Sequence, residues 1–346
     1  MSTMTAAVLY GKEDVRIESV PVPQVGPGEV LVRVEAALTC GTDLKVFRRG
    51  YHAKMLVPPA LFGHELAGVI IAIGDGVSKW KVGDRVVSLN SAPCGVCFFC
   101  DRGQENLCED LLFNNGAYAE FIRIPARIVE KNMLLVPEDM SFTAAALTEP
   151  LACVVRGLDE MQPEPGESIV IIGAGPIGLM FLQVARAYGL RAIAVVKRDE
   201  QVVAAKHFGA EHVVQTTDKP EPIEAVKRLT NGRGADLSVE CVAQPLGWQW
   251  AVEMVRKGGR VNFFGGCAAG TKVELDTNRI HYSEISMKAT FHHTPAAGRK
   301  AFELLRTGAV HSHDFITGQA NLSDLETVLR RMMNRNGEIK TAILPR

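Results

Sequence analysis

The second half of the sequence alternates short apolar runs with amphipathic runs, and this alternation constrains the fold more than any other feature. Apolar and amphipathic runs follow one another at 168–175, 176–189, 191–196, 199–209, 211–216, 235–242, 246–259 and 260–266. Short apolar strands that alternate with helices predict a parallel sheet covered on both faces. We therefore expect a doubly wound α/β domain in this part of the chain.

A glycine-rich turn joins the first of these strands to the first helix. The segment VIIGAGPIG carries Gly173, Gly175 and Gly178 in a G-x-G-x-x-G pattern, with Pro176 and Ile177 between the last two glycines. Such glycines allow a tight turn and a close backbone approach to a pyrophosphate at the helix N-terminus. Inside an alternating β/α pattern, the motif predicts a dinucleotide-binding loop.

The end of the second strand indicates which dinucleotide this loop would bind. An acidic residue there would bind the ribose hydroxyls of NAD, whereas cations suit the 2′-phosphate of NADP. The strand ends at Val196 and is followed by Lys197 and Arg198, so the sequence favours NADP over NAD. Two alternatives stay open: Asp199 could act as a displaced ribose acid, or the two cations could be ordinary surface residues.

Residues 1–140 differ in character from the second half. Strand-like runs separated by Gly and Pro stand at 29–38, 66–74, 84–89 and 117–125, which is typical of a β-rich domain with long loops. Ser141 can cap a helix that begins at Phe142. Near the C-terminus, Ser323 and Glu326 have the spacing of a capping box, and a strand is expected at 339–344.

Four of the eight cysteines lie within fifteen residues, in the segment CGVCFFCDRGQENLC. They are Cys94, Cys97, Cys100 and Cys108, and Gly95 and Gly103 allow the chain to fold back between them. Four thiolates can surround one zinc ion and leave no position for a substrate. We interpret the segment as a structural zinc site; a disulfide pair and an iron–sulfur cluster are the alternatives.

Four further residues could form a second, open metal site. Cys40, His64, Glu65 and Glu149 each stand in an apolar neighbourhood, where a carboxylate is costly to bury unless it meets a cation. A thiolate, an imidazole and a carboxylate on zinc leave a fourth position for water or an alcohol, whose proton is then lost more easily. Taken singly, each residue could instead be structural: a buried thiol, a core histidine or an acid at a helix end.

The charge and hydropathy of the chain exclude some functions. With 38 Lys and Arg against 39 Asp and Glu, the formal charge is −1, so no general attraction to nucleic acid or to an anionic membrane is expected. The N-terminus lacks the pattern of a signal peptide. The most apolar run, 169–184, is interrupted by glycines and is shorter than the ~20 residues of a membrane span. We expect a cytoplasmic protein, where clustered thiols bind metals more often than they form disulfides.

Together these residues resemble the zinc-dependent medium-chain dehydrogenase/reductase (alcohol dehydrogenase) family, in its sorbitol and threonine dehydrogenase-like branch. The likeness covers essentially the whole chain. It is most specific in GHELAGVIIAIGDGV and in the four-cysteine segment, and CGTD, TEPLA and GAGPIGL add to it. The resemblance implies a GroES-like β-rich catalytic domain over 1–150 and 291–346, a Rossmann NAD(P)-binding domain over 151–290 and a substrate cleft where they meet.

The resemblance also implies a role for each residue of the open site. It implies two zinc ions per chain, one structural and one catalytic, with the catalytic ion on Cys40, His64 and either Glu65 or Glu149. Thr42 matches the hydroxyl that takes the proton of the alcohol, and VECVAQP and VNFFGG match segments that line the cofactor. A homodimer or homotetramer is implied by the family alone.

Four positions depart from the family pattern, and three of them, Val46, His292 and His293, depart from its polyol-specific members. The residue three positions after Thr42, often a histidine that passes the proton outward, is Lys45, which could act as a relay only with a lowered pKa. Val46 stands where a tyrosine is usual, and His292-His293 replaces an Arg-Tyr pair. The two histidines could contact substrate or nicotinamide, or could be polar residues at a domain crossover.

We therefore expect an enzyme that transfers a hydride between NAD(P) and a secondary alcohol or polyol-like substrate, or the matching ketone, with sorbitol itself disfavoured. A threonine-type β-hydroxy amino acid dehydrogenase and a non-catalytic nucleotide-binding module are the alternatives. Intact Cys40, His64, Glu65 and Glu149 argue against the non-catalytic module.

Overall fold

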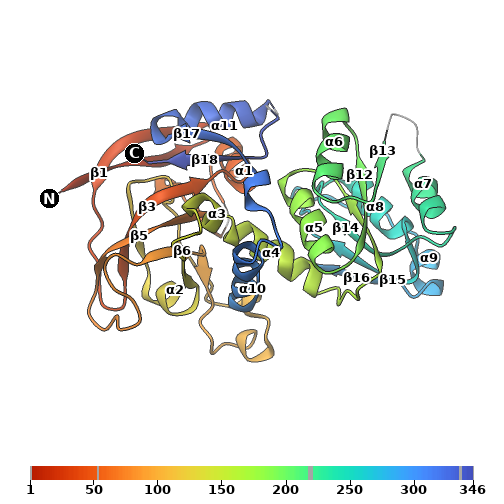
Figure 1. Ribbon diagram of the computed structural model, residues 1–346, viewed down its shortest axis with the longest axis horizontal. Coiled ribbons are helices and arrows are strands. Elements are labelled where there is room, and N and C mark those ends of the chain that lie inside the picture. Colours follow the sequence, from red (N-terminus) through yellow and green to blue (C-terminus); the bar gives the residue numbers. More distant parts are fainter. Residues whose placement is uncertain (1, 53, 217–220, 335–336, 346) are drawn as a thin grey trace. The chain divides into compact units, whose positions relative to one another are not determined.

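The structure is a computed structural model that describes residues 2–52, 54–216, 221–334 and 337–345 (Figure 1). Its internal contacts divide the chain into two compact units. Unit 1 comprises Met1–Ala152, His293–Gly308 and Ser312–Arg346, and unit 2 comprises Cys153–His292 and Ala309–His311. Unit 1 is therefore built from segments near both ends of the sequence.

Unit 1 is rich in short strands joined by long loops. Its strands are β1 (Thr3–Gly11), β2 (Asp14–Pro21), β3 (Val30–Leu38), β4 (Ala60–Leu61), β5 (Leu66–Ile73), β6 (Arg85–Ser88), β7 (Ser91–Ala92), β8 (Leu112–Phe113), β9 (Phe121–Ile124), β10 (Met133–Leu135), β17 (Ile316–Asn321) and β18 (Lys340–Leu344). Its helices are α1 (Gly41–Arg49), α2 (Ala126–Lys131), α3 (Phe142–Ala146), α10 (Pro295–Arg306) and α11 (Leu325–Met333). Helix α4 (Thr148–Asp159) begins in unit 1 and continues into unit 2.

Strand β3 organises the largest sheet of unit 1. It pairs antiparallel with β5, β9 and β18, and the sheet runs in the order β10-β6-β5-β3-β18-β17. Its sequence, VLVRVEAAL, is rich in β-branched residues, which suit a buried pleated surface. Strand β18 joins it from the far end of the chain, with Ile343 opposite Ala37 and both side chains fully buried.

Two expected helix starts have different outcomes. Ser141 caps α3 as expected, because its Oγ accepts a hydrogen bond from the backbone N–H of Ala144 at 3.1 Å. The prediction of a capping box at Ser323 and Glu326 is wrong. Helix α11 begins at Leu325 after a short 3₁₀ turn, and the Glu326 carboxylate pairs with Arg330 one turn further along the helix.

Unit 2 contains one six-stranded parallel sheet. Its strands are β11 (Ser168–Ile172), β12 (Arg191–Val196), β13 (His212–Gln215), β14 (Ala235–Glu240), β15 (Val255–Phe263) and β16 (Ser286–Ala289), in the order β13-β12-β11-β14-β15-β16. Helices α5 (Pro176–Ala187), α6 (Asp199–His207), α7 (Pro222–Leu229), α8 (Pro245–Glu253) and α9 (Thr277–Tyr282) flank it (Figure 1). The predicted doubly wound α/β domain is confirmed.

One boundary in unit 2 was predicted incorrectly. The helix expected over 246–259 ends at Glu253, and the chain enters β15 at Val255. Val255 is fully buried and pairs with Ala235 at the start of β14. The pattern VRKGG is too polar to predict a strand, and its pairing with β14 is interrupted after Val255 and resumes at Arg260, so the start of β15 is marked by the burial and pairing of Val255 and not by the local pattern.

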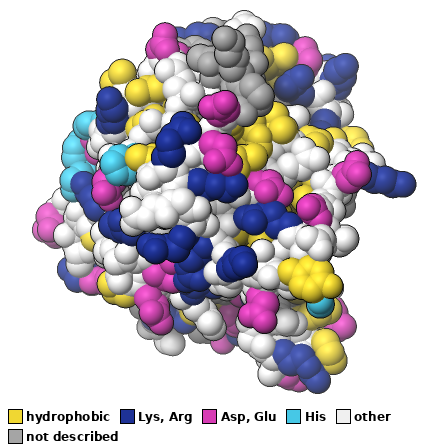
Figure 2. Space-filling model, turned by 90° about the vertical axis from the view of Figure 1, so that its right-hand side faces the viewer, with side chains coloured by type: hydrophobic (Ala, Val, Ile, Leu, Met, Phe, Trp, Pro, Cys, Tyr) yellow, Lys and Arg dark blue, Asp and Glu magenta, His cyan; other side chains and the backbone are white. Residues whose placement is uncertain are grey.

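The surface carries charges of both signs. On the face shown in Figure 2, which is the side of Figure 1 where β11–β16 lie, Lys and Arg side chains gather near the centre, with Asp and Glu side chains among and around them. Among the residues described, no helix is long and apolar enough to cross a membrane.

Candidate metal centre and nucleotide loop

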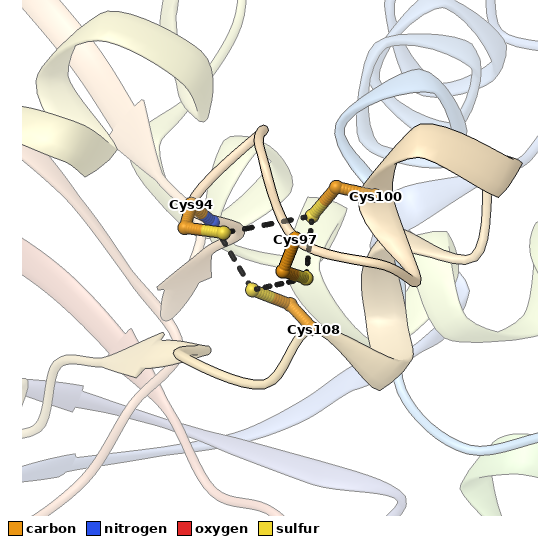
Figure 3. A group of neighbouring side chains, drawn as sticks. All are labelled: Cys94, Cys97, Cys100 and Cys108. Atoms are coloured by element: carbon orange, nitrogen blue, oxygen red, sulfur yellow. Dashed lines mark hydrogen bonds between the residues drawn. The ribbon is translucent and has the colours of Figure 1, made fainter.

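The four clustered cysteines bring their sulfur atoms together (Figure 3). Cys97 Sγ lies 3.6 Å from Cys100 Sγ and 3.9 Å from Cys108 Sγ, and Cys94 Sγ lies 3.9 Å from Cys100 Sγ. Four sulfurs placed tetrahedrally at ~2.3 Å from a zinc ion would be about 3.8 Å apart. None of the four forms a disulfide, so the donor set and its spacing fit a closed structural zinc site.

Local backbone conformation produces this arrangement. Gly95 and Gly103 have φ angles of +86° and +68°, the left-handed region that glycine adopts without strain. The four thiols are not equally easy to ionise: backbone hydrogen bonds from Cys100 and Glu109 lower the pKa of Cys97 to about 6, whereas burial raises the pKa of Cys100 and of Cys108. A thiolate is the form that binds metal, so Cys97 is the thiol of this loop best prepared for an ion.

A second group of ligand-type atoms lies at the start of α1. Cys40, His64 and Glu65 each offer one atom, and these atoms lie within 4.8 Å of one another. Cys40 is the N-cap of α1, and its Sγ accepts a hydrogen bond from the backbone N–H of Thr42 at 3.4 Å. The structure therefore brings together three residues that are up to 25 positions apart in the sequence.

Asp43 and Tyr118 orient His64 in this group. His64 Nδ1 lies 2.9 Å from Asp43 Oδ1, and Tyr118 Oη donates to Asp43 Oδ2 at 2.6 Å. A carboxylate on one ring nitrogen leaves the other nitrogen for a metal, which is the usual second shell of a zinc-bound histidine. Burial opposes the imidazolium, but Asp43 and Cys40 outweigh burial and raise the pKa of His64. A position that stabilises positive charge in this way suits a cation.

Glu65 is held by a lysine from the C-terminal strand. Lys340 Nζ donates to both carboxylate oxygens of Glu65, at 2.9 and 2.7 Å, and to the carbonyl of Thr39 at 2.6 Å. Both side chains are buried. Burial opposes the ammonium charge, but Glu65 and Cys40 outweigh it and raise the pKa of Lys340. A metal at this position would thus compete with Lys340 for the Glu65 carboxylate.

Glu149 lies in the first turn of α4 and is also buried. Its Oε1 is 3.8 Å from Nε2 of His293, which in turn is 3.0 Å from Asn90 Oδ1. Burial raises the pKa of Glu149 to about 7, although His64 opposes the shift. The ligand-type atom of Glu149 thus lies beside that of His293 and outside the group of Cys40, His64 and Glu65, although His64 is near enough to act on it electrostatically.

The remaining predicted residues of α1 differ in exposure. Thr42 is half-buried in the first turn, two residues after the Cys40 cap. Lys45, one turn further along, is exposed, whereas Asp43 between them is buried. Thr42 is thus close to the ligand group, and Lys45 faces solvent.

The G-x-G-x-x-G segment forms the turn between β11 and α5. Gly173 has a φ of +97°, and a Cβ at Gly178 would collide with the Gly173 carbonyl oxygen, so both positions require glycine. Gly175 is the N-cap of α5 and Pro176 its first residue, and both are exposed, so the helix N-terminus is accessible. The first N–H groups of a helix have no partner within it and can bind an anion. Ile177 is half-buried in that turn. This geometry fits a pyrophosphate.

The residues after β12 are accessible but not equally free. Lys197 is exposed, while the Arg198 guanidinium forms an ion pair with Glu200. Gln201 Oε1 accepts hydrogen bonds from the backbone N–H groups of both residues, each at 3.2 Å. Asp199 accepts a hydrogen bond from Gln215 on β13 at 2.6 Å, so its carboxylate is already engaged.

Comparison with known proteins decides the family. Residues 26–137 match the model of the alcohol dehydrogenase GroES-like domain, and residues 176–307 match that of the zinc-binding dehydrogenases. A sorbitol dehydrogenase of Bacillus subtilis is 32% identical over 99% of this chain and 97% of its own length. An L-threonine 3-dehydrogenase of Bacillus velezensis is 33% identical over 95% of this chain and 94% of its own.

The chain belongs to the zinc-dependent medium-chain dehydrogenase/reductase family. It is thus an enzyme of the zinc-binding alcohol dehydrogenase type, and its two units have the GroES-like and Rossmann folds of that family. A putative zinc-binding dehydrogenase of Sinorhizobium meliloti, whose crystal structure contains NADP, has a TM-score of 0.90 and 27% identity, covering 100% of both chains.

Three residues around this dehydrogenase's candidate metal centre were missed by the sequence analysis. Asp43 and Lys340 are buried charges that contact His64 and Glu65, and Tyr118 hydrogen-bonds Asp43. Asp43 could have been found from the sequence, because the CGTD motif places it three residues after the candidate ligand Cys40. Lys340 has a weaker sequence signal, because it is a lysine in the otherwise apolar strand KTAIL. Tyr118 has no such signal, since a tyrosine among apolar residues is typical of any core.

Proposed function

We propose that the enzyme transfers a hydride between NAD(P) and a secondary alcohol or polyol-like substrate, or the corresponding ketone, with NADP favoured over NAD. The observation that carries the proposal is the group of Cys40, His64 and Glu65, in which Cys40 is half-buried and the other two side chains are buried. A thiol, an imidazole and a carboxylate are the donors of zinc sites that keep one position open.

In this proposal, Cys40 and His64 hold the catalytic ion, and Asp43 fixes the tautomer and orientation of His64. Glu65 and Glu149 can each complete the donor set. Because Lys340 already donates hydrogen bonds to Glu65, Glu149 is supported as the direct ligand. The proximity of Glu65 to Cys40 and His64 supports Glu65 instead. When bound, zinc lowers the pKa of a coordinated hydroxyl and polarises a carbonyl.

Thr42 is proposed to accept the proton of the alcohol. Its place in the first turn of α1, where its backbone N–H donates to Cys40 Sγ, supports this role. Lys45 stands one turn further along α1 and is exposed, so it could pass the proton to solvent only in its neutral form. The proton route beyond Thr42 is therefore proposed to reach water directly or through Lys45.

The cofactor is proposed to bind with its pyrophosphate at Gly173, Gly175 and the first turn of α5, where Pro176, Ile177 and Gly178 follow. The exposed ammonium of Lys197 supports binding of a 2′-phosphate, and Arg198 would have to share its charge with Glu200. The engagement of Asp199 with Gln215 argues against a ribose acid at this place. The NADP found in the Sinorhizobium meliloti structure is a further support.

The proposal also includes the oligomeric state, the partners and the location of the enzyme. The family supports a homodimer or homotetramer with no nucleic acid or membrane partner. The donor set of four thiols, none in a disulfide, supports the reducing environment of the cytoplasm.

The test is the change of nicotinamide absorbance with NADP⁺ and NAD⁺ side by side. The panel contains simple secondary alcohols, vicinal diols, sugar alcohols, cyclitols and L-threonine. We expect turnover with an alcohol class and a higher kcat/KM with NADP⁺, lost in Cys40→Ser and retained in Cys153→Ser, a thiol outside both donor groups. A preference for NAD⁺ would overturn the 2′-phosphate assignment, and no turnover of any alcohol would overturn the substrate class.

L-threonine is the second candidate substrate, because the Bacillus velezensis relative is an L-threonine 3-dehydrogenase. Turnover of L-threonine above that of every simple alcohol would favour this candidate. The same panel therefore decides between the two.

A further inference from the structure

A short loop follows β14 and lies against the nucleotide turn. Cys241 donates its backbone N–H to the carbonyl of Ile172 at 2.9 Å, which brings the ends of β14 and β11 together. A Cβ added to Gly173 would lie 2.6 Å from Cγ2 of Val242. Val242 therefore covers the first glycine of the G-x-G-x-x-G segment, at the edge of the sheet where dinucleotides bind.

The conformation of this loop is unusual. Ala243 has a φ of +62°, the left-handed region that residues other than glycine rarely adopt. Such a conformation persists only where surrounding contacts hold it. The loop over Gly173 thus needs an anchor.

Glu240, the last residue of β14, supplies that anchor. Its side chain is fully buried, and its Oε1 accepts hydrogen bonds from the backbone N–H groups of Val242 at 2.6 Å and of Ala243 at 2.8 Å. Hydrogen bonds to a carboxylate are about twice as strong as those to a neutral acceptor. One side chain therefore holds both residues of the loop.

The surrounding backbone leaves space for this carboxylate. A Cβ at Gly247, in the first turn of α8, would lie 2.7 Å from Glu240 Oε1, and a Cβ at Gly265 would collide with Oε2. The Gly265 N–H also donates to the Glu240 carbonyl at 2.8 Å. Segments after β14, after β15 and at the start of α8 thus meet around one acid.

We propose that Glu240 is a positioning residue for the dinucleotide: through Val242 and Ala243 it sets the distance between the loop and Gly173, and so the space for the cofactor. This inference rests on the proposed function, since it requires that the chain bind NAD(P). Glu240 acts through the loop and does not itself touch the cofactor.

Two substitutions of Glu240 test the role. Glu240→Met fills a similar volume without an acceptor, and we expect its Kd for NADP⁺, measured by calorimetry without alcohol, to rise about tenfold. Glu240→Gln keeps a neutral acceptor, so a two- to fourfold rise in Kd is expected, about half of the Glu240→Met effect on a logarithmic scale. At saturating cofactor, kcat should change less than threefold in both, because the reacting groups are untouched.

A rescue variant separates positioning from a general loss of stability. Ala243→Gly adopts the left-handed conformation without strain. In the Glu240→Met or Glu240→Gln background it should recover at least half of the lost affinity on a logarithmic scale, and in the wild type it should change Kd less than twofold. If Glu240→Met does not fold, the same comparison is made in the Glu240→Gln background.

A matched control lies on the same strand. Asp236, near the opposite end of β14, accepts hydrogen bonds from Ser168 and Arg256. Asp236→Asn should lower the melting temperature without altering the Kd for NADP⁺. Amide hydrogen exchange without cofactor should accelerate at Val242 and Ala243 in Glu240→Met and stay unchanged there in Asp236→Asn.

The outcomes distinguish the two proposals. Equal cofactor affinity in wild type and in the Glu240 variants would overturn the inference and leave the proposed function standing. A loss of affinity that Ala243→Gly does not restore would also overturn it, in favour of a purely structural role. A folded wild type that binds neither NADP⁺ nor NAD⁺ would overturn the proposed function, and this inference with it.

Discussion

At the scale of single residues, the buried charges of unit 1 are held by partners of opposite charge or by hydrogen bonds. Glu65 meets Lys340, and Asp43 meets His64 and Tyr118. Removing one member of a buried ion pair leaves an uncompensated charge, which costs more than the pair itself contributes. The same contacts orient the candidate zinc ligands, so stability and function depend on the same side chains.

Lys340→Met should therefore lower the free energy of unfolding by about 3–5 kcal/mol, because Glu65 would stay buried without its cation. Urea unfolding at pH 7 measures the change. The double variant Lys340→Met/Glu65→Leu should recover a large part of the loss, since it buries no charge. Equal stability of the single and double variants would contradict the ion-pair account.

The ionisation of Asp236 predicts how the stability of the fold depends on pH. Partial burial opposes its ionisation, but hydrogen bonds from Ser168 and the ion pair with Arg256 outweigh burial and lower its pKa from 3.8 to about 2. A group whose pKa is lowered in the folded state adds stability that is complete above its unfolded pKa and is lost as the pH falls toward the folded value. The contribution of Asp236 is thus present at pH 7 and declines between about pH 4 and pH 2.

Asp236→Asn should be less stable than wild type by about 1–2 kcal/mol at pH 7, after allowance for solvent screening. The difference should shrink as the pH is lowered from 4 to 3, in urea unfolding at each pH. A difference that stayed constant over this range would show that ionisation of Asp236 does not stabilise the fold.

At the scale of elements, two loops depend on very local sequence. The four-cysteine loop places its sulfurs through Gly95 and Gly103, and the nucleotide turn depends on Gly173 and Gly178. Each loop is short, so its geometry follows from residues that are close in the chain. For the same reason each is sensitive to a single substitution.

Cys97→Ser should remove one of the two zinc equivalents expected per chain and lower the melting temperature, because the polar loop depends on the ion for its order. Metal content by atomic emission and thermal unfolding measure both effects. Cys40→Ser should also lose one equivalent but change the melting temperature less, since its neighbours lie in a packed core. Two equivalents retained in Cys97→Ser would exclude a zinc site at this loop.

The two helix starts provide a matched pair. Ser141→Ala removes the side-chain cap of α3 and should cost about 1 kcal/mol in urea unfolding. Ser323→Ala should change stability by less than about 0.5 kcal/mol, because Ser323 does not cap α11. A larger cost at Ser323 than at Ser141 would contradict the structure of both helix starts.

At the scale of the whole molecule, unit 1 depends on the C-terminal end of the chain. Strand β18 pairs with β3 and β17 in the largest sheet, and Ile343 is fully buried in the core around it. A terminal segment placed in this way contributes as much to the stability of the fold as a central strand does. The end of the chain is therefore not dispensable for this fold.

Ile343→Ala should lower the free energy of unfolding by about 2–5 kcal/mol, the usual cost of a cavity in a packed core. Leu135→Ala, on edge strand β10 of the same sheet and 57% exposed, should cost less than about 0.5 kcal/mol in the same urea titration. Similar small costs for both variants would mean that the C-terminal strand is not part of the cooperative core.

The sequence alone determined the fold class, the four-thiol group and the glycine turn, because each depends on residues that are near one another in the chain. The periodicity of 168–266 predicts a parallel sheet from local pattern, and the cysteine spacing places four donors in one loop. Only the tertiary structure decided which side chains surround His64 and Glu65. Lys340 is 275 positions from Glu65, and Tyr118 is 75 from Asp43. It also decided that α8 ends at Glu253, because Val255 just after it is buried and pairs with Ala235 at the start of β14. Contacts of this kind depend on how distant strands align in a sheet, and local spacing carries no information about that alignment.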